Sequence, residues 1–116
     1  MTTPRCPITT HVLDLSLGLP AAGLEVTLCA FDGGLFTERA RRRTDADGRV
    51  GDLLPALAIE PGVYRLRFFV AEYFQAGGRT SFYPYIDVVF ELDPSRAHHH
   101  VPLLLSPYGY STYRGS

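Results

Sequence analysis

The stretch GVYRLRFFV, residues 62–70, shows the clearest alternation of apolar and polar positions in the chain. Its even-numbered positions carry Tyr64, Leu66, Phe68 and Val70, whereas two of the odd positions carry arginine. Successive side chains of a β-strand point to opposite faces, so this pattern predicts a strand with one apolar face.

Further short apolar runs lie on both sides of this stretch, separated by turn signals. Residues 32–34 (DGG) and 44–50 (TDADGRV) have the glycine and aspartate composition of tight turns. A brief helix signal, AEYFQAGG at 71–78, ends in two glycines. Short strands spaced by turns, with one short helix, predict an all-β antiparallel sandwich. The other predicted strands are residues 10–17, 24–31, 85–92 and 98–105.

Residues 35–43, LFTERARRR, fit a charged edge strand and a short helix equally well. The arginine-rich part, residues 39–43, is expected to be a solvated edge, and contact with a subunit or a partner is the alternative.

Length and composition favour one globular domain over residues 1–116, with residues 1–7 as a flexible N-terminus. The net charge of −1 gives no reason to expect nucleic acid or an anionic membrane as a partner. No secretory signal and no apolar run of about 20 residues is present, so the expected location is the cytoplasm. Cys6 and Cys29 form no CxxC motif and are expected to be reduced thiols.

Three of the four histidines are consecutive, at positions 98–100. On a strand, His98 and His100 share one face and His99 points to the other. A pair of this kind can hold a metal only with a further ligand such as His11. The sequence has no matching carboxylate pattern, so no metal site is expected, and a solvated polar start of the last strand is the plainer interpretation.

The segment DADGRV resembles a calcium-binding loop at first sight. Counted from Asp45, however, the fifth position is Arg49 and the twelfth is Ala56, where a bidentate glutamate is required. The segment therefore predicts a β-turn that places Arg49 directly after it. No nucleophile elbow, P-loop or dinucleotide fingerprint is present, and Ser116, as the last residue, is not expected to be a triad nucleophile.

Three stretches together resemble the transthyretin-related 5-hydroxyisourate hydrolases: residues 8–28 (ITTHVLDLSLGLPAAGLEVTL), 44–50 (TDADGRV) and 100–116 (HVPLLLSPYGYSTYRGS). The terminal YRGS is the most specific of them. The resemblance implies a transthyretin-like sandwich of about eight strands with one short helix. It also implies a homotetramer, a dimer of dimers, with active sites along a channel where the dimers meet.

The family's motifs carry over to this sequence residue by residue. Its N-terminal catalytic histidine, in THVLD, corresponds to His11, and the arginine of its DGR turn corresponds to Arg49. Its second catalytic histidine directly precedes VPLLLSP and corresponds to His100. Many members have an aromatic residue between two histidines here, whereas this chain has His99, so the roles of His98 and His99 stay open. The terminal signature corresponds to Tyr113, Arg114, Gly115 and Ser116.

The implied reaction is hydrolysis of the cyclic amide of 5-hydroxyisourate to 2-oxo-4-hydroxy-4-carboxy-5-ureidoimidazoline in urate degradation. The hypothesis is that His11 and His100 activate water, and that Arg49 binds the substrate and stabilises developing charge. Ser116 would position substrate or water, and the other three residues of the terminal signature would help to bind the substrate. No metal or organic cofactor is needed for this chemistry. The alternative function is that of a transthyretin-like carrier of a small molecule, without catalysis.

Overall fold

The alternating segments form strands in the computed structural model of this chain, which describes residues 7–54 and 60–116. Among these residues there are nine strands and one short helix, α1 (Val70–Ala76). The strands are β1 (Ile8–Asp14), β2 (Leu19–Pro20), β3 (Glu25–Asp32), β4 (Leu35–Arg43), β5 (Arg49–Val50), β6 (Gly62–Phe68), β7 (Ile86–Leu92), β8 (His99–Ser106) and β9 (Gly109–Thr112).

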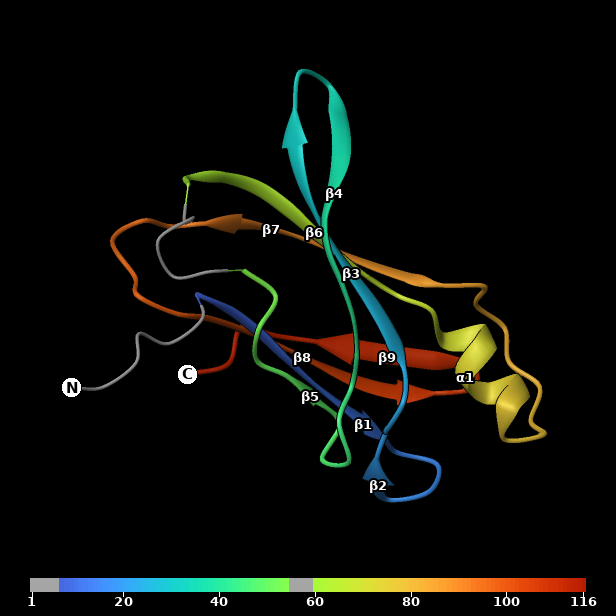
Figure 1. The fold of residues 1–116 in the computed structure, drawn as a ribbon. Helices are drawn as coiled ribbons and strands as arrows, with labels where there is room; N and C mark the ends of the chain where they lie inside the picture. Colours follow the sequence, from blue (N-terminus) through green and yellow to red (C-terminus); the bar gives the residue numbers. More distant parts are fainter. Residues whose placement is uncertain (1–6, 55–59) are drawn as a thin grey trace.

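The strands form two sheets that pack face to face (Figure 1). One sheet has the order β2-β1-β8-β9, with the two-residue strand β5 also paired to β1. The other has the order β4-β3-β6-β7. The predicted all-β sandwich with one short helix is confirmed.

One strand pair differs from the antiparallel pattern. β1 and β8 run parallel, with Ile8 opposite His99 and Asp14 opposite Leu105. The two strands come from opposite ends of the chain, so no hairpin turn imposes an antiparallel direction on them. This pairing places Ile8 and Thr9, just before the THVLD segment, opposite His99 and His100 at the start of β8.

The core lies between the sheets and follows the predicted alternation. In β6, Tyr64, Leu66 and Phe68 are buried, while the arginines between them face outward. In β1 the even-numbered residues are buried, so Thr9 and His11 lie on the outer face of their sheet. The next even-numbered residue after β6, Val70, is also buried but begins the helix.

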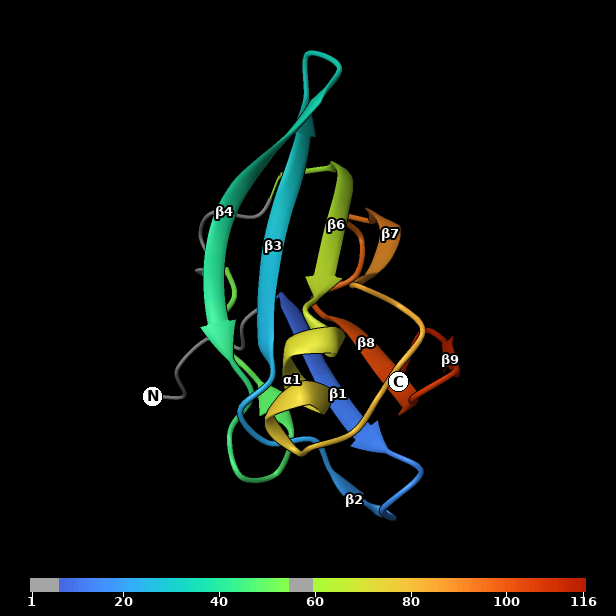
Figure 2. The same ribbon diagram turned by 90° about the vertical axis from the view of Figure 1, so that its right-hand side faces the viewer.

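The helix and the turns also follow the sequence pattern. α1 lies at the end of the sandwich where β6 finishes (Figure 2), and it ends at Gly77 and Gly78 as predicted. The β3–β4 hairpin turns through Gly33 and Gly34, whose φ angles of 61° and 87° favour glycine. This hairpin projects beyond the rest of the molecule.

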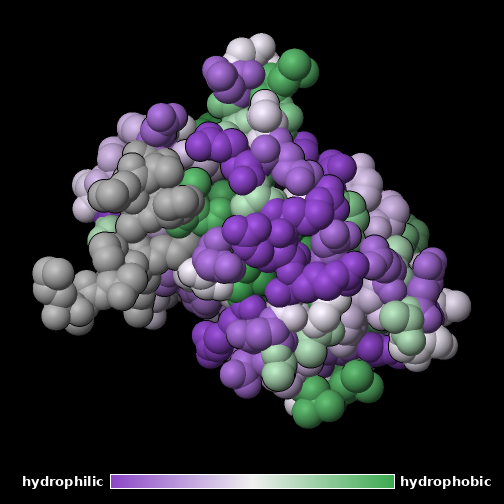
Figure 3. All heavy atoms as spheres, in the orientation of Figure 1, coloured by the Kyte–Doolittle hydropathy of each residue, from purple (hydrophilic) through white to green (hydrophobic). Residues whose placement is uncertain are grey.

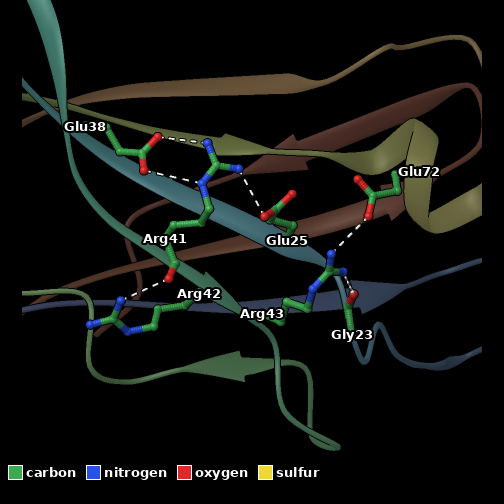
Figure 4. Close-up of polar contacts among 7 residues, drawn as sticks. All are labelled: Gly23, Glu25, Glu38, Arg41, Arg42, Arg43 and Glu72. Atoms are coloured by element: carbon green, nitrogen blue, oxygen red, sulfur yellow. Dashed lines mark hydrogen bonds and ion pairs between the residues drawn. The ribbon is translucent and has the colours of Figure 1, made fainter.

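The ambiguous segment 35–43 is the edge strand β4, the first of its two alternatives. Its arginines form ion pairs with neighbouring carboxylates (Figure 4). Arg41 lies 2.8 Å from Glu38 and 3.0 Å from Glu25, and Arg43 lies 3.1 Å from Glu72. A charged edge of this kind discourages pairing with a further strand.

The expected flexible N-terminus falls mainly on residues 1–6, which lie outside the described residues, as does Cys6. Pro7 does not belong to a flexible segment, because it is buried and its carbonyl accepts the His99 N–H at 2.7 Å. Cys29 is a free, buried thiol. Over the described ranges no helix is both long and apolar enough to cross a membrane.

Candidate active site

A cleft of about 290 Å³ opens on the outer face of the β1–β8 sheet. It lies where β1, β5, the start of β8 and the end of the chain meet. The residues that line it are Thr9, Thr10, Arg49, Val50, Gly51, His98, His100 and Ser116.

Strand register places the predicted catalytic residues on one face. His11 lies directly opposite Arg49 across the β1–β5 pair, and Thr9 lies directly opposite His100 across the β1–β8 pair. Paired residues project from the same side of a sheet. His11 is therefore one strand across and two residues along from His100, about 8 Å at ordinary sheet spacing. One small heterocycle can reach both.

The turn before β5 holds Arg49 in place. The Asp45 carboxylate accepts the N–H groups of Asp47 at 2.9 Å and Arg49 at 3.0 Å. The Gly48 carbonyl accepts the Val12 N–H at 2.8 Å, which ties the turn to β1. Gly48 has a φ of 75°, and a Cβ there would collide with the Val12 carbonyl oxygen. This position therefore requires glycine, and the guanidinium that follows it starts from a rigid base.

The chain end lies against His100. The Gly115 N–H donates to the His100 carbonyl at 2.8 Å, as an isolated antiparallel bridge. A Cβ on Gly115 would lie 2.5 Å from Cδ2 of the His100 ring. The absence of a side chain thus lets the tail pack on the imidazole, and this contact brings Ser116 to the cleft.

The three consecutive histidines are separated as strand alternation predicts. His98 and His100 face the cleft, with their rings stacked at 6.0 Å between centroids. His99 is buried on the other side, where its Nε2 accepts the Asp93 N–H at 2.9 Å. Among the described residues no group of three metal-ligating side chains is assembled.

Not every predicted site residue lies at this cleft. Arg49, His100 and Ser116 line it together, His11 is paired with Arg49, and Gly115 packs on His100. Tyr113 and Arg114, the first two residues of the terminal signature, lie instead at a second, more apolar cleft of about 190 Å³ near β7 and β9. Its lining residues are Val88, Phe90, Glu91, His99, Val101, Thr112, Tyr113 and Arg114.

Four residues of the cleft lining were not predicted from the sequence: Thr9, Thr10, Val50 and Gly51. Thr9 is the one that contacts the histidines of the cleft. Its hydroxyl oxygen lies 2.8 Å from His98 Nε2 and 2.8 Å from His100 Nδ1. One signal of this position was present in the sequence: Thr9 is two residues from His11, so both side chains lie on the same face of a strand. Threonine is common in strands for reasons of packing, so this signal alone did not indicate a function.

Asp14, the aspartate of the THVLD segment, has a structural role and does not line the cleft. Asp14 is fully buried at the end of β1 and accepts hydrogen bonds from Arg79 at 2.6 Å, Ser16 at 2.6 Å and Tyr73 at 2.8 Å. Burial alone would raise the pKa of Asp14, but these donors outweigh it and lower the pKa to about 2. The carboxylate therefore ties β1 to α1 and the loop after it, away from the cleft.

The fold and the cleft define a transthyretin-like sandwich that carries histidine and arginine on the outer face of one sheet. The family model described as the HIUase/Transthyretin family matches residues 8–115, and the chain belongs to this family.

Similar proteins include both hydrolases and a transthyretin. The 5-hydroxyisourate hydrolase of Mus musculus is 45% identical over 118 residues, covering 100% of both chains. The structure of the Klebsiella pneumoniae 5-hydroxyisourate hydrolase superposes with a TM-score of 0.82 at 34% identity, over 94% of this chain and 97% of that one. Sea bream transthyretin in complex with thyroxine superposes with a TM-score of 0.91 at 32% identity, over 95% of each chain.

Proposed function

We propose that this chain hydrolyses 5-hydroxyisourate, in the breakdown of urate. The observation that carries the proposal is the convergence of Arg49, His100 and Ser116 in one cleft, with His11 beside Arg49. These groups come from four distant parts of the chain. A structural β-sandwich does not need polar groups of this kind to meet on its outer face.

In the proposed mechanism the two imidazoles activate water. Histidine suits this task because its ordinary pKa, about 6.5, lies near neutral pH. One ring takes a proton from water as the oxygen attacks the amide carbonyl, and the other orients the water or the ring that acts. The proton then goes to the leaving ring nitrogen, which completes opening of the six-membered ring.

Arg49 supplies the positive charge for this reaction. Its planar guanidinium can bind a carbonyl oxygen through two N–H groups and stabilise the oxyanion that forms there. The rigid turn that ends at Gly48 fixes its starting point, so little entropy is lost on binding. The hydroxyl of Ser116, which also lines the cleft, would position substrate or water.

Gly115 and the pair Tyr113 and Arg114 have different proposed roles. Gly115 lets the tail pack on His100 and is proposed to shape the substrate site directly. Tyr113 and Arg114 line the second cleft, so we propose that they serve the site by holding the tail rather than from within the first cleft.

We also propose a homotetramer built as a dimer of dimers. β7 and β9 are the last strands of the two sheets and lie on the same side of the molecule (Figure 2). Val89 on β7 and Tyr110 on β9 are 57% and 43% exposed. β9 carries no charged residue, whereas β7 carries the exposed Glu91 and Asp87, which pairs with Arg67 at 2.7 Å. Neither strand has the arginine cluster of β4, and an edge without such a cluster favours pairing with another strand, here with a second copy of the chain.

The surface for contact between dimers is proposed to lie near β2. Leu15, Leu17 and Leu19 are 57%, 54% and 58% exposed. Hydrophobic residues gather at the end of the molecule where β2 lies (Figure 3). An apolar surface of this kind is typical of a protein interface. For location we propose the cytoplasm, which suits a free, buried thiol such as Cys29.

Decay of freshly generated 5-hydroxyisourate, followed by absorbance, tests the proposed function. A hydrolase at a concentration far below the substrate accelerates the decay in proportion to its amount over many turnovers. The similarity to thyroxine-bound sea bream transthyretin makes a carrier the second candidate. A carrier would protect or bind at most one equivalent of ligand per site, and decay at the spontaneous rate would overturn the proposal.

A further inference from the structure

His100, the proposed catalytic histidine of β8, is hydrogen-bonded to Thr9, and Thr9 is in turn hydrogen-bonded to His98. The Thr9 hydroxyl oxygen lies 2.8 Å from His100 Nδ1 and 2.8 Å from His98 Nε2. The two rings are stacked, with 6.0 Å between centroids and 21° between planes. All three side chains line the same cleft.

A threonine hydroxyl carries one hydrogen, so it donates at most one of these two bonds. At least one bond must therefore be donated by a ring N–H to the threonine oxygen. If Thr9 donates to His98 Nε2, then His100 carries hydrogen on Nδ1. If Thr9 donates to His100 Nδ1, then His98 carries hydrogen on Nε2. The protonation patterns of the two rings are therefore linked through Thr9.

Of the two arrangements in which Thr9 donates to a ring, only the first gives His100 the form that a general base needs. With hydrogen on Nδ1, the lone pair of neutral His100 is on Nε2, the nitrogen that Thr9 does not hold. We infer that Thr9 and His98 are positioning residues, which hold His100 as the Nδ1–H tautomer so that Nε2 accepts the proton from water. This inference rests on the function proposed above.

The same arrangement remains in place when His100 becomes charged. A proton leaves water and bonds to Nε2, and the hydroxide oxygen bonds to the amide carbon of the substrate. The Nδ1–H of the imidazolium still donates to Thr9, whose hydroxyl still donates to His98 Nε2. Two cationic rings 6.0 Å apart would repel, so His98 stays neutral. The amide C–N bond then breaks as the proton on Nε2 moves to the leaving nitrogen, and His100 returns to its starting form.

The tautomer can be measured directly and without substrate. Nitrogen-15 NMR of the imidazole side chains in the assembled protein distinguishes Nδ1–H from Nε2–H. We expect neutral His100 to be the Nδ1–H tautomer in the unsubstituted protein. Thr9→Val removes the hydroxyl at nearly constant shape and should shift His100 toward the Nε2–H form. Thr9→Ser, the matched control, keeps the hydroxyl and should keep the Nδ1–H form.

Kinetics supply the second measurement. Thr9→Val should lower kcat about 10- to 100-fold, the usual effect of losing one hydrogen bond to a group that becomes charged, with KM little changed. Thr9→Ser should retain most of kcat. His98→Phe, which keeps a flat ring without nitrogen, should lower kcat in the same direction, whereas His98→Gln retains an acceptor and should recover part of it.

Several results would overturn the inference. These are an Nε2–H form of His100 in the unsubstituted protein, an unchanged tautomer in Thr9→Val, or equal losses of kcat in Thr9→Val and Thr9→Ser. The NMR result does not depend on the identity of the substrate. If 5-hydroxyisourate is not hydrolysed while the tautomer shifts as expected, the proposed function fails and the link through Thr9 stands.

Discussion

Glycine at position 115 shows how a single missing side chain can shape the proposed active-site cleft. The tail passes so close to His100 that any Cβ at this position would overlap the imidazole. Gly51 lines the same cleft, but a Cβ there would meet nothing within 4 Å. The two glycines therefore form a matched pair, one packed against a proposed catalytic group and one open to solvent.

Replacing Gly115 with alanine should lower turnover at least tenfold. The added methyl group forces the tail or the His100 ring to move, and this displaces the imidazole from the position needed for proton transfer. The stability of the protein should change little, since the terminus contributes few buried contacts. Gly51→Ala is the comparison variant: it adds the same methyl group at the cleft wall without contacting His100, and it should lower turnover much less than Gly115→Ala. Steady-state kinetics on both variants makes the comparison, and equal activities would contradict the role given to the tail.

At the scale of elements, the buried Asp14–Arg79 ion pair links β1 to the loop after α1. Asp14 has a pKa of about 2 in the folded protein, below its ordinary value of 3.8. A lowered pKa stabilises the folded state above the ordinary pKa, and this contribution is lost as the pH falls from about 4 toward 2. The shift corresponds to about 2 kcal/mol of unfolding free energy at neutral pH.

Arg79→Gln should therefore reduce stability at pH 7 and reduce it less at pH 3, where Asp14 in the variant becomes protonated. Arg96→Gln, which removes an exposed pair with Asp93 at 3.6 Å, is the control and should change stability little at either pH. Urea unfolding at a fixed protein concentration measures both. An Arg79→Gln deficit that is the same at pH 7 and pH 3 would speak against the assigned pKa.

Most strands could be predicted from the sequence because one of their faces is buried and the other is not. β6 is the clearest case, and the buried positions of that strand are those expected from alternation. β4 stayed ambiguous because it lies at a sheet edge, where most side chains face solvent and no apolar period develops. β5 has only two residues and no pattern to detect, and only the turn before it marked the position of Arg49.

The site was less predictable than the fold, because its geometry depends on contacts between distant segments. Resemblance to a family supplied His11, Arg49, His100 and Ser116 as candidates. The parallel pairing of β1 with β8, which brings Thr9 opposite His100, has no local sequence signal. The same holds for the tail, whose passage over His100 is a tertiary contact.

At the scale of the whole molecule, the proposed tetramer places exposed leucines between dimers. Leu19→Glu introduces a charge into this surface. The tetramer should then dissociate into dimers, because burying an unpaired carboxylate is costly. Turnover should fall with it, since the family resemblance puts the active sites along the channel between dimers. Sedimentation equilibrium gives the mass of the assembly. The matched control is Leu35→Glu at the tip of the β3–β4 hairpin, where the leucine is 72% exposed. A Leu19→Glu tetramer with full activity would refute this assignment of the interface.

The account as a whole depends on His100 acting as part of one catalytic cleft. Asparagine in its place keeps a polar group within reach of Thr9 but cannot take a proton from water. The decisive measurement is the turnover of 5-hydroxyisourate by His100→Asn, with circular dichroism and sedimentation confirming unchanged folding and assembly. We expect kcat to fall by about 10²- to 10⁴-fold, the usual contribution of a general base. Near-normal turnover by a correctly assembled His100→Asn protein would contradict the account.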